Sequence, residues 1–83
     1  MQKFNYQYGL YEAIDGLFAY QQGDQSGIHD PQLTHAVKNY LKTLTPQELT
    51  NIVQEFLKGY LSEDYGYEEE YRQTFQKWIK NLI

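Results

Sequence analysis

Apolar residues recur at helical spacing along most of the chain, which predicts a largely α-helical protein. The first segment places four of them on one helical face, with Tyr6 one turn earlier: Leu10, Ile14, Leu17 and Phe18. Gly16 interrupts this segment, and it either weakens the helix or lets a neighbouring helix approach closely. The polar stretch "QQGDQSG" then has no periodicity, so residues 21–29 are predicted to form a loop.

Two later helices carry clear start signals. Asp30 can cap a second helix, and Pro31 suits its first position because the N–H that proline lacks would be unpaired there. The motif "TPQE", residues 45–48, has a threonine cap, a proline and a glutamate three residues on, which together predict a capping box. Each signal is followed by an apolar stripe at helical spacing.

A fourth helix is predicted near the C-terminal end, beginning near residues 63–67 with Ser62 or Asp64 as its cap. Its apolar stripe has five members, and Tyr67 lies one turn earlier: Tyr71, Phe75, Trp78, Ile79 and Leu82. Trp78 shares this stripe and is therefore expected in the core. No stretch alternates with the period of a β-strand. The expected fold is all-α, a small bundle or orthogonal array of about four amphipathic helices, forming one domain over residues 1–83.

Composition narrows the possible functions. The 83 residues include 11 acids and 7 bases, a formal net charge of -4, and no cysteine. This balance argues against direct binding of nucleic acid, which needs clustered lysine and arginine, and against anionic membrane surfaces. No stretch is long and apolar enough to span a membrane, and the N-terminal residues do not resemble a signal peptide. The cytoplasm is the expected location.

The most unusual stretch is "LSEDYGYEEEY", residues 61–71, here called the acidic segment, which has five acids, three tyrosines and no base. Acids near a helix start are stabilised by the helix macrodipole, and this alone explains their sign and position. It does not explain Tyr65 and Tyr67, which flank Gly66 and cannot both enter one core if that segment is helical. Exposed tyrosine beside acid is typical of protein interfaces. The candidate binding residues are therefore Glu63, Asp64, Tyr65, Tyr67, Glu68, Glu69 and Glu70.

The nine tyrosines raise a second question. Tyr40, Tyr60 and Tyr71 fit half-buried helix positions with the hydroxyl reaching water. In the first segment, four tyrosines point in different directions around a helix, and at least two should be exposed or face another molecule: Tyr6, Tyr8, Tyr11 and Tyr20.

Metal binding and catalysis have little support in the sequence. His29 and His35 lack the ligand spacing of zinc sites, and aligning Gly27 with the glycine of an EF-hand loop leaves its first and last positions without carboxylates. Glu12 and Asp15 lie one turn apart, but they fall on the face opposite the apolar stripe. We expect no cofactor, no metal and no enzymatic activity.

Two functions remain as hypotheses. The first is a protein-binding adaptor, inhibitor or immunity-type protein that presents the acidic, tyrosine-bearing surface to a basic site on another protein. The second is a structural subunit that homo-oligomerises through a tyrosine- and leucine-rich helical face. The mass of the protein in solution separates them, because the second requires a stable dimer or larger assembly.

Overall fold

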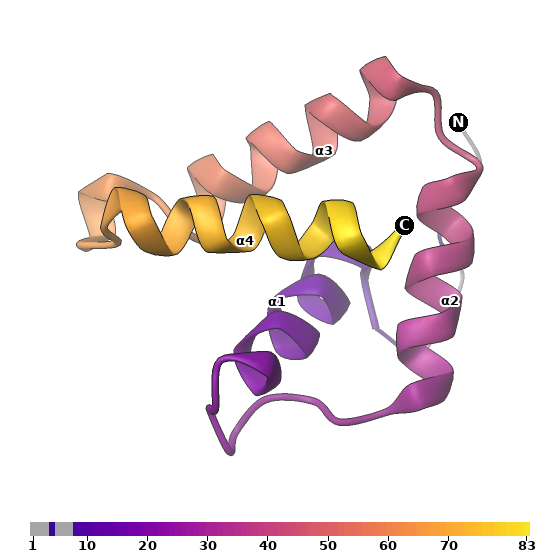
Figure 1. The fold of residues 1–83 in the computed structure, drawn as a ribbon, viewed down its shortest axis with the longest axis horizontal. Coiled ribbons are helices and arrows are strands. Elements are labelled where there is room, and N and C mark those ends of the chain that lie inside the picture. The colour runs from indigo at the N-terminus through magenta and orange to yellow at the C-terminus, as the bar shows by residue number, and fades with distance from the viewer. Residues whose placement is uncertain (1–3, 5–7) are drawn as a thin grey trace. The chain divides into compact units, whose positions relative to one another are not determined.

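The computed structural model describes Phe4 and residues 8–83, and this part of the chain is all-α (Figure 1). Its elements follow in the order α1 (Leu10–Gln21), α2 (Pro31–Lys42), α3 (Pro46–Gly59), the short 3-10 helix η1 (Glu63–Tyr65) and α4 (Glu69–Leu82). The described residues contain no strand. The prediction of an all-α fold with about four helices is confirmed. Tyr6, assigned to the first apolar stripe, lies outside the described residues.

The chain divides into two compact units, Met1–Thr43 and Leu44–Ile83. The first contains α1 and α2, and the second contains α3, η1 and α4. The single domain predicted over residues 1–83 stays a prediction. Among the described residues, none of the helices combines the length and the apolar character that crossing a bilayer requires.

In the first unit, most of the buried residues belong to the predicted apolar stripes, but Ala13 was not predicted and Leu10 is only half-buried. The Asp30 side chain accepts hydrogen bonds from the backbone N–H groups of Gln32 and Leu33, at 3.0 and 3.3 Å, and Pro31 opens α2. Two N–H groups at the helix start therefore have an acceptor, as the sequence predicts. The buried side chains of α1 and α2 are Ala13, Ile14, Leu17, Phe18, Leu33, Val37 and Leu41.

The loop between α1 and α2 packs closely against α1. The backbone N–H of Ile28 donates to the carbonyl of Gly16 at 2.9 Å, and a Cβ placed on Gly16 would lie 2.7 Å from Ile28 Cγ1. A Cβ on Gly27 would lie 2.8 Å from the Tyr20 Cα, which is backbone. Gly16 therefore makes room for the side chain of a loop residue, and the prediction that it admits a neighbouring helix is not supported by this contact.

In the second unit, α3 begins at the predicted capping box. Thr45 Oγ1 accepts from the Glu48 N–H at 3.1 Å, and Glu48 Oε1 accepts from the Thr45 N–H at 2.9 Å. The hydrogen bond from the Thr45 backbone lowers the pKa of the Glu48 carboxyl, because it favours the charged form. The prediction for this helix start is confirmed.

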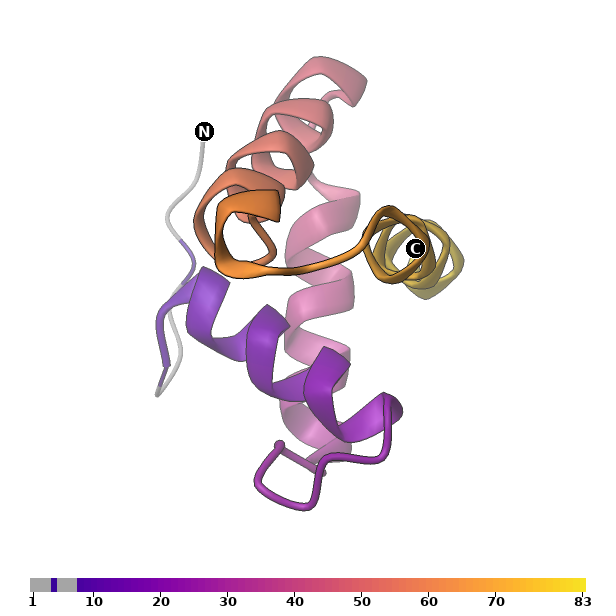
Figure 2. The ribbon, with the colours of Figure 1, turned by 90° about the vertical axis from the view of Figure 1, so that its left-hand side faces the viewer.

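α3 and α4 meet through stacked aromatic rings. Phe56 and Phe75 lie with ring centroids 4.4 Å apart, and both side chains are buried. Figure 2 shows α4 almost end-on, with the connection from η1 leading into it. Trp78 is half-buried and its ring lies 6.0 Å from that of Phe75. The prediction that Trp78 lies in the core is wrong, because Phe75 and Ile79 take the buried positions of α4 and Trp78 is rotated about 100° from Ile79.

Candidate functional site

The acidic segment begins with a turn that is stabilised in part by hydrogen bonds among its own residues. Ser62 Oγ accepts from the Asp64 N–H at 3.1 Å and so caps η1. Gly66 follows at φ +90°, a left-handed conformation that residues with a Cβ rarely adopt. The turn therefore ends at Gly66.

α4 starts later than the sequence indicates. It begins at Glu69, with Glu68 at the cap position and no side-chain hydrogen bond capping the helix. The predicted start near residues 63–67 is wrong, and so is the assignment of Ser62 or Asp64 as the cap of the fourth helix. The capping signal is real, but it serves the separate 3-10 turn, because the left-handed Gly66 ends that turn before α4 can begin.

Every residue from 63 to 70 is exposed. All seven predicted binding residues lie in this range, so the structure gathers them along one continuous exposed stretch between α3 and the first turn of α4. Neither Tyr65 nor Tyr67 enters the core, although the stretch between them is not the continuous helix that the expectation assumed.

The two flanking tyrosines differ in their surroundings. Tyr65 is 72% exposed, the largest exposure among the large hydrophobic side chains of the described residues. Tyr67 is 38% exposed, and its ring stacks on that of Tyr71 with a centroid separation of 5.6 Å. Tyr67 therefore has contacts within its own unit, whereas the Tyr65 ring extends from the turn into solvent.

Arg72 connects the end of α3, η1 and the start of α4 through hydrogen bonds. This residue was not identified from the sequence. Its Nε donates to the Leu61 carbonyl at 3.0 Å, and its Nη1 donates to Glu63 Oε1 at 2.7 Å and to Glu69 Oε2 at 3.1 Å. The Arg72 side chain is only 18% exposed. The available signal was a single arginine placed directly after five acids in eleven residues.

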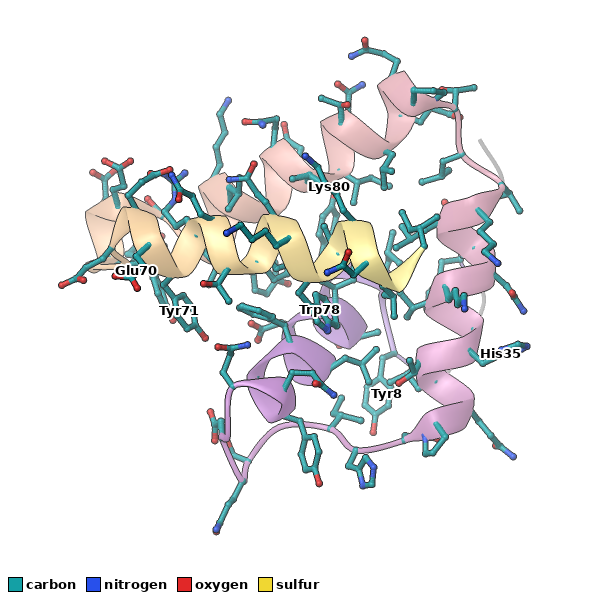
Figure 3. All side chains as sticks on the ribbon, in the orientation of Figure 1. Tyr8, His35, Glu70, Tyr71, Trp78 and Lys80 are labelled. Atoms are coloured by element: carbon teal, nitrogen blue, oxygen red, sulfur yellow. The ribbon has the colours of Figure 1, made fainter. Side chains whose placement is uncertain are left out.

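The five acids therefore fall into two sets. Glu63 and Glu69 are paired with Arg72. In the part of the chain that the structure describes, no ion pair or side-chain hydrogen bond involves the carboxylates of the other three: Asp64, Glu68 and Glu70. Figure 3 shows Glu70 extending away from the start of α4 and Lys80 near its opposite end. This order of charge along α4 suits the helix macrodipole.

The acidic segment also accounts for the charge of the whole chain. Together with Arg72 it holds five of the 11 acids and one of the 7 bases, a local net charge of -4. The six acids and six bases elsewhere cancel, so the formal net charge of the chain, also -4, originates in these twelve residues.

Of the other sequence candidates, His29 and His35 line one open hollow at the start of α2. The His29 ring stacks on Tyr20 at 4.6 Å, and His35 points outward from α2 (Figure 3). No group of three or more metal-ligating side chains occurs among the described residues. Glu12 is exposed and Asp15 is half-buried. Burial raises the pKa of the Asp15 carboxyl, and the nearby negative charge of Asp24 raises it further.

The expectation that at least two of the four tyrosines near the N-terminal end are exposed or face another molecule stays a prediction, because Tyr6 lies outside the described residues. Tyr20 is exposed, while Tyr8 and Tyr11 are half-buried. Tyr40 and Tyr71 occupy the half-buried positions assigned to them, and Tyr60 is exposed at the end of α3, where it stacks on Phe56.

A small apolar groove lies between α3 and α4. Its volume is about 210 Å³, below the range of roughly 300–1,000 Å³ that is usual for small-molecule sites. Its lining residues are Leu49, Thr50, Val53, Gln54, Gln76, Ile79, Lys80 and Ile83. The groove involves none of the seven residues assigned to the candidate surface.

Comparison with known proteins adds no further assignment: no family model, no curated protein and no solved structure matches the chain.

Proposed function

We propose that the protein is a protein-binding module, an adaptor, inhibitor or immunity-type protein, which presents the acidic segment to a basic site on another protein. The observation that carries this proposal is the 72% exposure of Tyr65 within a turn that is fixed by local hydrogen bonds. A large aromatic side chain held in solvent by an ordered turn gives a contact surface at small entropic cost.

The charges and the tyrosine have different tasks in this proposal. The unpaired carboxylates of Asp64, Glu68 and Glu70 attract a positively charged partner and speed association. Tyr65 supplies affinity by inserting its ring into a pocket on the partner, as aromatic anchors do in many interfaces. The proposed partner is a protein with a basic surface and not a nucleic acid, because phosphate groups would be repelled by the local charge. The proposed role is binding and not catalysis.

Site-specific photo-crosslinking tests the proposal. A photoreactive phenylalanine analogue replaces Tyr65 in one variant and Tyr20, which is 39% exposed and lies outside the acidic segment, in a control. Both variants are expressed in the native host and irradiated. We expect a defined protein adduct from position 65, weakened by added salt, and no such adduct from position 20. Equal adducts from both positions, or none from position 65, would contradict the proposal.

The second function is tested by the same crosslinking variants together with a measurement of the protein's mass in solution. If the chain were instead a structural subunit, position 65 would be unreactive and the protein would have a mass in solution at least twice the 9.9 kDa of one chain. A stable dimer whose interface contains Tyr8 and Tyr11 would favour this alternative.

A further inference from the structure

We infer that Arg72 is the positioning residue of the proposed binding surface, and that Glu63 and Glu69 serve it instead of contacting the partner. This inference rests on the proposed function, because it assigns roles within the same surface. It divides five acids that look equivalent in the sequence into a pair that holds the turn and three that remain open to a partner.

The contacts of Arg72 connect three separate pieces of chain. The Leu61 carbonyl follows the end of α3, Glu63 lies in η1, and Glu69 opens α4. The Leu61 side chain is 2% exposed, so this end of the connection is fixed in the core of the second unit. The Arg72 guanidinium therefore holds the chain on both sides of Tyr65: at Leu61 and Glu63 before it, and at Glu69 after it.

Arginine is specifically suited to this position. Its planar guanidinium directs several N–H groups from a fixed framework, and here Nε and Nη1 serve different acceptors. A lysine ammonium is a single charged centre on a flexible stem, and it lacks the Nε that donates to Leu61. Arg72→Lys therefore keeps the charge of the region while removing part of the framework.

Holding the turn has a consequence for binding. If the segment were free in solution, a partner would have to order the backbone between α3 and α4 when it bound Tyr65, and affinity would fall accordingly. With Arg72 in place, the turn that carries Tyr65 is already ordered. Hydrogen bonds between charged groups are stronger than neutral ones, so their loss should open the turn measurably.

Amide hydrogen exchange without any partner tests the positioning role. Two double variants lose the same number of negative charges: Glu63→Gln with Glu69→Gln, and Glu68→Gln with Glu70→Gln. We expect the hydrogen-bonded amides of the turn, those of Asp64, Tyr65 and Gly66, to exchange roughly tenfold faster or more in the first double variant and in Arg72→Lys. The second double variant should exchange as the wild type does, and the amides of α3 should be unaffected throughout. Equal acceleration in both double variants, or none in either, would overturn the inference.

Photo-crosslinking from position 65 then connects the turn to binding. Arg72→Lys, introduced beside the photoreactive residue, should lower the yield of the adduct although the net charge is unchanged. An undiminished yield in a variant whose turn exchanges faster would overturn the positioning role while leaving the proposed function intact. The absence of an adduct with Arg72 present would instead refute the proposed function.

Discussion

At the scale of single residues, the acidic segment contains side chains that pack against the rest of the protein and side chains that do not. Tyr65 is largely surrounded by solvent, whereas Tyr67 contacts Tyr71. Stability and binding should therefore respond differently to changes at the two positions, although both tyrosines occur beside the same glycine.

Replacing Tyr65 with alanine should change the free energy of unfolding by no more than about 0.5 kcal/mol, since little of its ring is buried. Tyr67→Ala should cost about 0.5–1.5 kcal/mol, because the stacking on Tyr71 is lost. Urea unfolding followed by circular dichroism measures both. A cost above about 1.5 kcal/mol for Tyr65→Ala would show that this side chain is part of the packed structure.

Two aspartates of the first unit should have opposite effects on the pH dependence of stability. Burial and the charge of Asp24 raise the pKa of Asp15, so the folded state holds this proton more tightly than the unfolded state does. Asp15 therefore lowers stability as the pH rises past the ordinary aspartate pKa of about 3.9. Hydrogen bonds from Ser26 lower the pKa of Asp24, so that carboxyl stabilises the fold above this pH and loses its effect as the pH falls.

The variant Asp15→Asn removes the half-buried charge and should be more stable than the wild type at pH 7. The gain should shrink toward zero near about pH 3, where Asp15 is itself protonated. Thermal unfolding across this pH range measures the difference. A variant that is less stable than the wild type at pH 7, or a gain that does not depend on pH, would contradict the assignment.

At the scale of elements, the start of α3 depends on neighbouring residues alone. Thr45→Ala should lower stability by about 1 kcal/mol, because the Glu48 N–H loses its acceptor. Thr43→Ala is a suitable control, since the Thr43 hydroxyl donates to the Tyr40 carbonyl at the other side of the connection and caps no helix start. Denaturant unfolding compares them. A loss of only a few tenths for Thr45→Ala would show that the cap contributes little.

Two glycines lie where the loop packs on α1, Gly16 in the helix and Gly27 in the loop, and they provide a matched pair of substitutions. An added Cβ at Gly27 meets the backbone of Tyr20, which cannot move aside, so Gly27→Ala should cost about 1–3 kcal/mol. An added Cβ at Gly16 meets the Ile28 side chain, and alanine is favoured over glycine within a helix by about 1 kcal/mol. Gly16→Ala should therefore be the milder change. The reverse order in unfolding experiments would mean that the loop does not pack on α1 in this way.

The elements that the sequence predicts well are those whose signals are local. The caps of α2 and α3 are made by side chains that accept from backbone N–H groups within three residues, those of Asp30, Thr45 and Glu48. These helix starts can therefore be recognised without tertiary information. The start of α4 could not be placed, because Ser62 provides a similar signal for η1 and the left-handed Gly66 intervenes. The role of Arg72 depends on acceptors nine and eleven residues away, and helical periodicity carries no such information. The same periodicity places Trp78 on the apolar stripe but does not tell how deeply each member of the stripe is buried.

At the scale of the whole molecule, charge is distributed unevenly along the chain. Twelve residues carry a net charge equal to that of all 83, while the remainder is balanced. Favourable helix-start chemistry accounts for acids at Glu69 and Glu70, and pairing with Arg72 accounts for Glu63. Neither explains why the same segment exposes Tyr65, and this combination is the basis of the proposed binding role.

Binding kinetics with the protein captured from position 65 test this role most directly. The wild type, Tyr65→Ala and the control Tyr20→Ala are compared by surface plasmon resonance at low and at physiological salt. Loss of an aromatic anchor worth about 2 kcal/mol predicts an affinity roughly thirtyfold lower for Tyr65→Ala, mainly through faster dissociation. The association rate of the wild type should fall as salt rises, and Tyr20→Ala should bind as the wild type does. Equal affinities for Tyr65→Ala and the wild type would contradict the assignment of the acidic segment as the binding surface.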